Sequence, residues 1–103
     1  MTNNRLDTLR GMVAANPTDT FARYALAMEY VKSSKFQDAV DEFGKLLETN
    51  ASYPAAYFHG GQALEKLGKL DEARALYQKG IEVTTATGDL HTRSELQAAL
   101  DIL

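Results

Sequence analysis

The sequence repeats its own side-chain pattern at a fixed interval. When residues 20–53 are laid over residues 54–87 without a gap, each position meets the one 34 residues further along the chain. The matched positions share size or charge, as in Ala22 and Ala56, Tyr24 and Phe58, Ala39 and Ala73, Phe43 and Tyr77, and Lys45 and Lys79. A period of this length is typical of stacked repeats, so the sequence predicts consecutive units that pack on one another.

Inside each copy, apolar residues recur at the three- and four-residue spacing of a helix. In the first copy this spacing is seen at Leu26, Ala27 and Tyr30, and again at Ala39 and Phe43. Between the two runs stands KSSKF in the first copy and KLGKL in the second, and such short polar stretches with serine or glycine are typical of turns. Each copy is therefore predicted to form two antiparallel helices.

Proline and short polar residues mark the predicted helix starts. Pro17 and Pro54 stand near two starts, where the N–H that proline lacks is not needed. Asp19 and Ser52 lie beside them, and both residue types are good N-caps. We therefore predict that Asp19 and Ser52 cap the helices that follow them.

The period, the hairpin and the alternation of small and large residues together resemble the tetratricopeptide repeat family. The matching residues are Leu26, Ala27, Tyr30, Ala39 and Phe43 in the first copy, and Tyr57, Gly60, Gly61, Leu64, Ala73, Tyr77 and Gly80 in the second. The resemblance implies an all-α fold of tandem antiparallel hairpins in a right-handed solenoid. It implies one domain with a leading helix (4–16), two repeats (20–53 and 54–87) and a C-terminal capping helix (88–103).

The stretch His59-Gly60-Gly61 admits two interpretations, a catalytic loop or a helix interior where small residues are needed for packing. A catalytic loop beside a nucleophile would need a β-rich segment and a G-x-S-x-G motif, and the sequence has neither. Two glycines inside a helix cost about 1 kcal/mol each relative to alanine, so packing must return that energy. We expect Gly60 and Gly61 where the two helices of the second hairpin touch.

No pattern of reactive residues indicates an enzyme. His59 and His91 do not form an H-E-x-x-H pair, and the chain has no cysteine, so no metal or cofactor site is expected. Asp71 and Glu72 are adjacent, and neighbouring residues on a helix point about 100° apart. We expect no catalytic residues, no metal and no cofactor.

Composition narrows the partners and the compartment. Eleven basic and 14 acidic residues give a net charge of -3, and the basic ones are scattered, which disfavours nucleic acid. The apolar runs fall far short of the ~20 residues that cross a bilayer, so no membrane contact is expected. The N-terminus lacks the features of a secretory signal and cysteine is absent, which favours a cytoplasmic protein.

The resemblance implies that the first helices of the repeats line a concave groove, which binds a protein or peptide partner. The groove residues expected from it are Phe21, Tyr24, Met28, Val31, Lys32, Phe58, His59, Gln62, Lys66 and Arg93. Phe21 and Met28 are expected in the groove, whereas Tyr24 and Phe58 are divided between groove and core. Some relatives grip a terminal carboxylate with lysine, asparagine and arginine, but only Arg93 agrees with that set, so no such clamp is expected.

The last helix leaves two questions open. The repeat register predicts a start near residue 89, whereas the capping-box sequence TRSE at residues 92–95 favours a start at residue 93. Leu96, Ala99, Leu100 and Leu103 form a helical stripe that the repeat register would turn toward the groove. Either this helix docks in a shifted register as a cap, or its leucines face another molecule. The second alternative would make the chain a homo-oligomerisation module.

Overall fold

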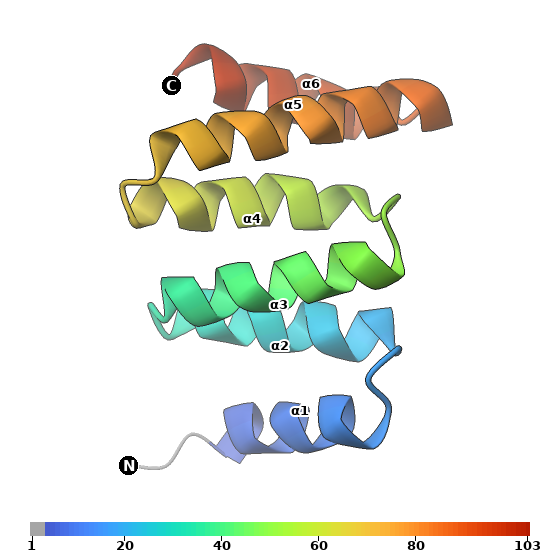
Figure 1. Ribbon diagram of the computed structural model, residues 1–103, viewed down its shortest axis with the longest axis vertical. Coiled ribbons are helices and arrows are strands. Elements are labelled where there is room, and N and C mark those ends of the chain that lie inside the picture. Colours follow the sequence, from blue (N-terminus) through green and yellow to red (C-terminus); the bar gives the residue numbers. More distant parts are fainter. Residues whose placement is uncertain (1–3) are drawn as a thin grey trace.

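The computed structural model describes residues 4–103, and in that range the chain forms α-helices and no β-strand. The helices are α1 (Asn4–Ala15), α2 (Thr20–Lys32), α3 (Phe36–Thr49), α4 (Pro54–Lys66), α5 (Leu70–Thr87) and α6 (Leu90–Asp101). They stack in chain order along the long axis of the molecule, from α1 at one end to α6 at the other (Figure 1). The predicted all-α fold of tandem helical hairpins is confirmed.

The two hairpins, α2 with α3 and α4 with α5, turn in the same way. Ser34 and Gly68, which are 34 positions apart, both adopt a left-handed backbone, with φ of 59° and 76°. After each turn the next N–H returns to a carbonyl of the first helix, Lys35 to Tyr30 at 2.8 Å and Lys69 to Leu64 at 2.9 Å. Glycine adopts this backbone without strain, whereas serine does so at a cost. The second turn therefore has the better sequence for the geometry.

Of the two predicted N-caps, Asp19 is confirmed and Ser52 is not. Asp19 caps α2, because its carboxylate accepts a hydrogen bond from the N–H of Ala22 at 3.1 Å. The prediction for Ser52 is wrong: the residue before α4 is Tyr53, which makes no side-chain cap, and the Ser52 hydroxyl donates to Asn50 instead. Pro54 is the first residue of α4, where its missing N–H costs no hydrogen bond.

The core runs through the whole stack in two apolar clusters. The first joins α1, α2 and α3 to α4 through residues such as Leu6, Leu26, Phe43 and Leu46. The second joins α4, α5 and α6 and is centred on Tyr77. Each helix is thus held by its neighbours in the stack, as expected for a repeat architecture.

The two glycines of the opening helix of the second hairpin lie where they were predicted. A Cβ on Gly61 would fall against the ring of Tyr77 from α5, closer than carbon atoms can approach. A Cβ on Gly60 would lie 2.9 Å from Leu76 and 3.5 Å from Phe43, so Gly60 contacts both α5 and α3. Neither glycine belongs to a loop, and the helix-packing interpretation is confirmed.

Arg23 and Tyr57 occupy the same position of the two repeats and perform the same task with different chemistry. The Arg23 guanidinium donates to the carbonyl of Pro17 at 3.0 Å, and the Tyr57 hydroxyl donates to the carbonyl of Ala51 at 2.6 Å. Each bond therefore ties a helix to the segment that leads into it. Arg23 is buried and is also paired with Glu42 of α3, which compensates its charge.

The last helix begins close to residue 89, as the repeat register predicts, but its later side chains do not pack as that register predicts. It begins at Leu90, and Asp89 caps it by accepting a hydrogen bond from the N–H of Thr92 at 3.1 Å. The alternative start at residue 93 is therefore wrong. Leu96 is fully buried against Gly80 of α5, and Ala99, Leu100 and Leu103 pack around the same cluster. The leucine stripe thus packs on the end of the stack, as a cap does, with Leu96 buried and the other three residues partly exposed.

No helix in residues 4–103 is long and apolar enough to cross a membrane.

Candidate functional site

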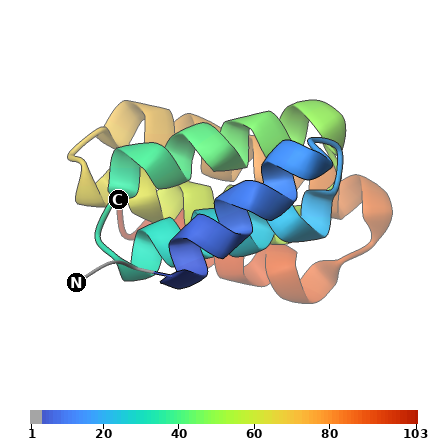
Figure 2. The same cartoon turned by 90° about the horizontal axis from the view of Figure 1, so that it is seen from below.

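The first helices α2, α4 and α6 carry two neighbouring hollows. The first, called the α2 hollow here, has a volume of 550 Å³ and is lined by Arg5, Phe21, Tyr24, Ala25, Met28, Glu29 and Lys32. Seen along the stack, α2 and α6 lie on one side and α3 on the opposite side (Figure 2). The α2 hollow therefore lies on the side of the first helices, where the sequence predicted a groove.

The second hollow, called the central hollow here, has a volume of 310 Å³. Four segments contribute to its lining, which consists of Val31, Phe36, His59, Gln62, Ala63, Glu65, Lys66, Ala99 and Ile102. Because α2, α4 and α6 all reach it, the central hollow depends on the docking of α6 as much as on the repeats. The two hollows together are called the groove below.

Tyr24 joins the two hollows. Its ring lies 6.2 Å from that of His59 in the central hollow, while Tyr53 at 5.3 Å and Phe43 at 6.3 Å hold its other sides. Tyr24 is half-buried and packs against the first apolar cluster, so it belongs to the core and to the groove wall at once. Burial raises the pKa of its hydroxyl, which keeps the group uncharged at neutral pH.

The remaining apolar groove residues differ in their exposure. Phe21 is 73% exposed, an unusual figure for a phenylalanine, and lies at the start of the α2 hollow. Met28 is half-buried one helical turn after Tyr24. Phe58 packs against the second cluster and meets His59 edge-on at 5.3 Å, and it does not line either hollow. Large apolar side chains left partly exposed in a row are typical of a surface that another molecule covers.

His59 sits at the centre of the groove, between α2 and α6. Burial lowers the pKa of its imidazole, and the hydrogen bond that the ring donates to Gln62 and the charge of Glu95 oppose that shift only in part. The ring is therefore mostly neutral at pH 7, and one nitrogen can donate while the other accepts. His59 and Gln62 are the uncharged polar side chains in the lining of the central hollow.

Arg93 is placed away from the other predicted groove residues. It lines a separate 280 Å³ depression on α6 with Leu90, Ser94 and Gln97. The physical reason is the packing of α6: since Leu96 turns into the core and Ala99 and Ile102 face the central hollow, Arg93 is carried to another side of the helix. Val31, Lys32, Gln62 and Lys66, in contrast, all line the groove.

Sequence reasoning missed several groove residues, among them Arg5, Glu29, Phe36 and Ile102. Arg5 reaches the α2 hollow because Glu29 holds its guanidinium at 3.2 Å, a pairing of residues 24 positions apart that has no local signal. Ile102 follows from the packing of α6. Ala99 belongs to the stripe that the repeat register turns toward the groove, and of that stripe it is the residue that lines the central hollow. Phe36 opens α3 next to the turn, and its large apolar side chain was the available signal.

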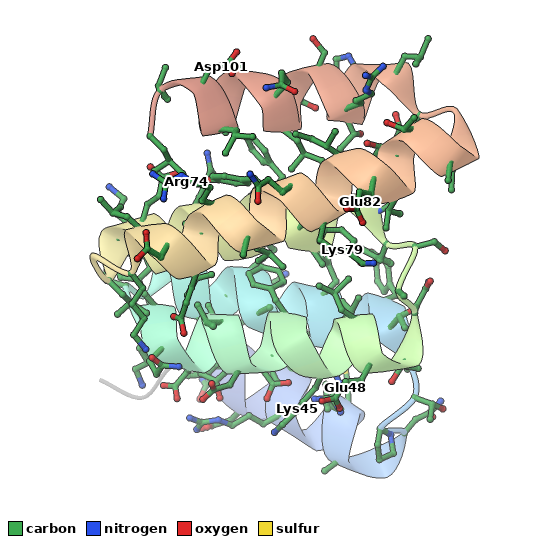
Figure 3. The ribbon with its side chains drawn as sticks, turned by 45° about the horizontal axis from the view of Figure 1, so that its top comes forward. Lys45, Glu48, Arg74, Lys79, Glu82 and Asp101 are labelled. Carbon is green, nitrogen blue, oxygen red and sulfur yellow. The ribbon has the colours of Figure 1, made fainter. Side chains whose placement is uncertain are left out.

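The opposite face of the stack holds a third hollow, called the outer hollow here. It has a volume of 400 Å³ and is lined mainly by apolar residues of α3 and α5: Val40, Phe43, Gly44, Leu47, Gly60, Leu64, Glu72, Ala75, Leu76 and Lys79. Lys79 lines it and Glu82 lies nearby on α5, whereas the equivalent residues of the first repeat, Lys45 and Glu48, lie on the side of α3 toward α1 (Figure 3). The outer hollow is therefore the alternative to the groove as a binding surface for a partner.

Nothing in residues 4–103 is arranged as a metal centre, since no three His, Asp or Glu side chains gather closely enough to hold an ion. His91 contacts Glu95 on its own helix at 3.4 Å. The sequence did not predict that His59 and His91 bind one metal ion together.

The fold and the groove define a protein of the helical-repeat class. A model of the family described as "Tetratricopeptide repeat" matches residues 24–88, and the chain belongs to this family. A comparison with curated protein sequences found no match.

Solved structures agree with this assignment. A tetratricopeptide repeat domain protein from Salinibacter ruber is 40% identical, with a TM-score of 0.76 over 82% of this chain and 86% of that one. A protein from Bordetella parapertussis is 24% identical, with a TM-score of 0.82 over 98% and 87%. PcrH, solved in complex with the chaperone binding region of PopD, is 14% identical, with a TM-score of 0.88 over 94% and 74%, a likeness of fold alone.

Proposed function

We propose that this chain binds a segment of a partner protein in the groove and acts as a scaffold or adaptor without catalysing a reaction. The observation that carries the proposal is the groove itself, a surface across α2, α4 and α6 on which apolar and polar side chains stand open to solvent. Phe21, Tyr24 and Met28 would supply contact area, and tyrosine and methionine do so at low ordering cost. His59 and Gln62 would orient the segment through hydrogen bonds.

The structural neighbours support this function by analogy. PcrH, which shares the fold, was solved with the chaperone binding region of PopD, so an array of this shape accommodates a polypeptide segment. Folds of this kind host many unrelated tasks, and the step from that complex to this chain remains an analogy. A cytoplasmic location is part of the proposal, in which the chain binds another protein of the cytoplasm.

Site-specific photo-crosslinking in the native cell tests the proposal. A photoreactive phenylalanine analogue is placed at Phe21 or Gln62, which line the groove, and at Gly44 as a matched site in the outer hollow. We expect one polypeptide to crosslink from the two groove sites, and the same product to weaken when Met28→Ala is added. Crosslinking from Gly44 alone would place the partner on the opposite face and contradict the proposal.

A further inference from the structure

The groove has more basic than acidic residues, whereas the whole chain has more acidic than basic ones. The chain carries a net charge of -3, whereas the two hollows are lined by three basic residues and two acidic ones. The basic residues are Arg5, Lys32 and Lys66, and the acidic ones are Glu29 and Glu65. The groove is thus slightly positive on a chain that is negative overall.

Both acidic residues are already bonded inside the molecule. Glu29 pairs with Arg5 at 3.2 Å, and Glu65 accepts a short hydrogen bond from the Tyr77 hydroxyl, which comes from the core. The side chains of Lys32 and Lys66 make no ion pair or hydrogen bond with any residue in the described range 4–103. A ligand cation would compete with internal bonds of the carboxylates, whereas a ligand carboxylate would meet two lysines that are free to bind it.

The outer face, formed by α3 and α5, carries more acidic than basic residues. On α3, Asp38, Asp41, Glu42 and Glu48 stand against the single Lys45, and on α5 acidic residues again outnumber basic ones. Charges of one sign steer a ligand of the opposite sign and keep it away from surfaces of its own sign. An acidic segment therefore gains from the groove and loses on the outer face.

We propose that the groove selects an acidic, apolar polypeptide segment, in which carboxylates of the partner meet Lys32 and Lys66 while its apolar side chains cover Phe21, Tyr24 and Met28. The two lysines occupy the same position in the two repeats, at the C-terminal ends of α2 and α4, so they mark one edge of the groove. The partner's carboxylates lie along that edge. This inference rests on the proposed function and names the kind of segment the groove takes.

The lysines also have a purely structural explanation. Each stands in the last turn of its helix, where a cation complements the helix dipole. That role changes the stability of the helix and is indifferent to the charge of a bound peptide. A measurement of peptide selectivity therefore separates the two explanations, whereas a measurement of stability does not.

The test uses two labelled synthetic peptides of twelve residues. One alternates leucine and phenylalanine with aspartate and glutamate, and its twin carries asparagine and glutamine in place of the acids. Fluorescence anisotropy with the full chain should show the acidic peptide binding several-fold tighter, up to about tenfold, because two exposed ion pairs contribute about that much together. The difference should shrink as salt is added.

Charge-reversed variants then locate the effect. The double variant Lys32→Glu with Lys66→Glu should abolish the preference for the acidic peptide. Lys79→Glu, a lysine of the outer hollow, should preserve it. Circular dichroism checks folding, and Lys32→Gln with Lys66→Gln replaces the double variant if it does not fold; this pair should also abolish the preference.

The outcomes are distinguishable. Equal binding of the two peptides overturns the inference and leaves the proposed function standing. The inference is also overturned if Lys79→Glu removes the preference as completely as the double variant does. Failure of both peptides to bind overturns the inference and the groove function together. Displacement of the acidic peptide by a twelve-nucleotide single-stranded DNA at equal concentration would show that the groove reads negative charge alone, and would overturn a polypeptide partner.

Discussion

At the scale of the residue, the two helices of the second hairpin meet at a position where no side chain fits. Gly61→Ala would drive a methyl group into the fully buried ring of Tyr77, which has no free space to move into. We expect a loss of about 1–3 kcal/mol in the free energy of unfolding, measured by urea denaturation followed by circular dichroism.

Gly44→Ala is the matched control, since its methyl group would enter open space on an exposed stretch of α3. Here we expect a gain of about 0.5–1 kcal/mol, because alanine favours the helix. An unchanged unfolding midpoint for Gly61→Ala would show that the two helices do not touch there.

The Tyr77 hydroxyl predicts a response to alkaline pH. Burial and the hydrogen bond to Glu65 raise its pKa well above 10, where a free tyrosine ionises. Above pH 10 the unfolded chain releases this proton and the folded chain keeps it, so stability is retained below that pH and falls as the pH rises further. Burial raises the pKa of Tyr24, Tyr53 and Tyr57 in the same direction.

The Tyr77→Phe variant should flatten the alkaline decline, since phenylalanine has no proton to lose. Urea midpoints of the wild type and the variant between pH 8 and pH 11 check this. An identical slope in the two proteins would mean that the hydroxyl is not protected by the fold.

Local sequence signals predicted some residue roles correctly. Asp19 was identified as a cap from its residue type and its place beside Pro17, and Gly60 and Gly61 were identified because the repeat pattern required small residues there. Ser52 misled, since Asn50 two residues earlier accepts its hydroxyl and leaves Tyr53 at the helix boundary. The bond between Arg23 and Pro17 could not be foreseen, because arginine at a tyrosine position gives no hint of its partner.

At the scale of the element, α6 shows what the sequence leaves open. The repeat register predicted a start near residue 89 and the capping-box sequence TRSE a start at residue 93, and the earlier start is observed. The Asp89 carboxylate accepts a hydrogen bond from the N–H of Thr92, and this bond lowers the pKa of the Asp89 carboxyl. The choice is tied to packing, because the observed start places Leu96 against Gly80. Tertiary contacts decide between local signals of similar strength, and a single sequence does not contain that comparison.

The docking of α6 is tested at its buried contact. Leu96→Ala removes a fully buried side chain from the second cluster and should lower the free energy of unfolding by about 2–5 kcal/mol. Ile102→Ala, a control on the same segment at 84% exposure, should change it by less than about 0.5 kcal/mol. If thermal melts showed an equally small loss of stability for Leu96→Ala and Ile102→Ala, α6 would not be docked as described.

At the scale of the whole molecule, the packing of the leucine stripe bears on self-association. Leu96 is fully buried and cannot contact a second copy, and Ala99, Leu100 and Leu103 are partly buried against the same cluster, so the chain itself covers part of the stripe. We therefore expect light scattering to give the mass of a monomer across a wide concentration series. A mass that rises with concentration would favour the homo-oligomerisation alternative.

The groove is the part of the molecule that the repeat pattern predicts least completely. The pattern identified residues of α2 and α4, because their positions repeat along the chain. It could not place Arg93 or find Ile102, since these depend on how α6 packs at the end of the array. The ends of a repeat array lack the neighbour that fixes the register of interior units.

The central claim is that the packing of the repeats leaves the groove on the first helices free to bind a partner. Amide chemical-shift mapping of the isotope-labelled chain, titrated with the acidic twelve-residue peptide, tests it most directly. The account predicts that the shifts change along α2 and α4, from Phe21 to Lys32 and from Phe58 to Lys66. Changes confined to the outer hollow, around Val40, Leu47 and Leu76, would contradict it.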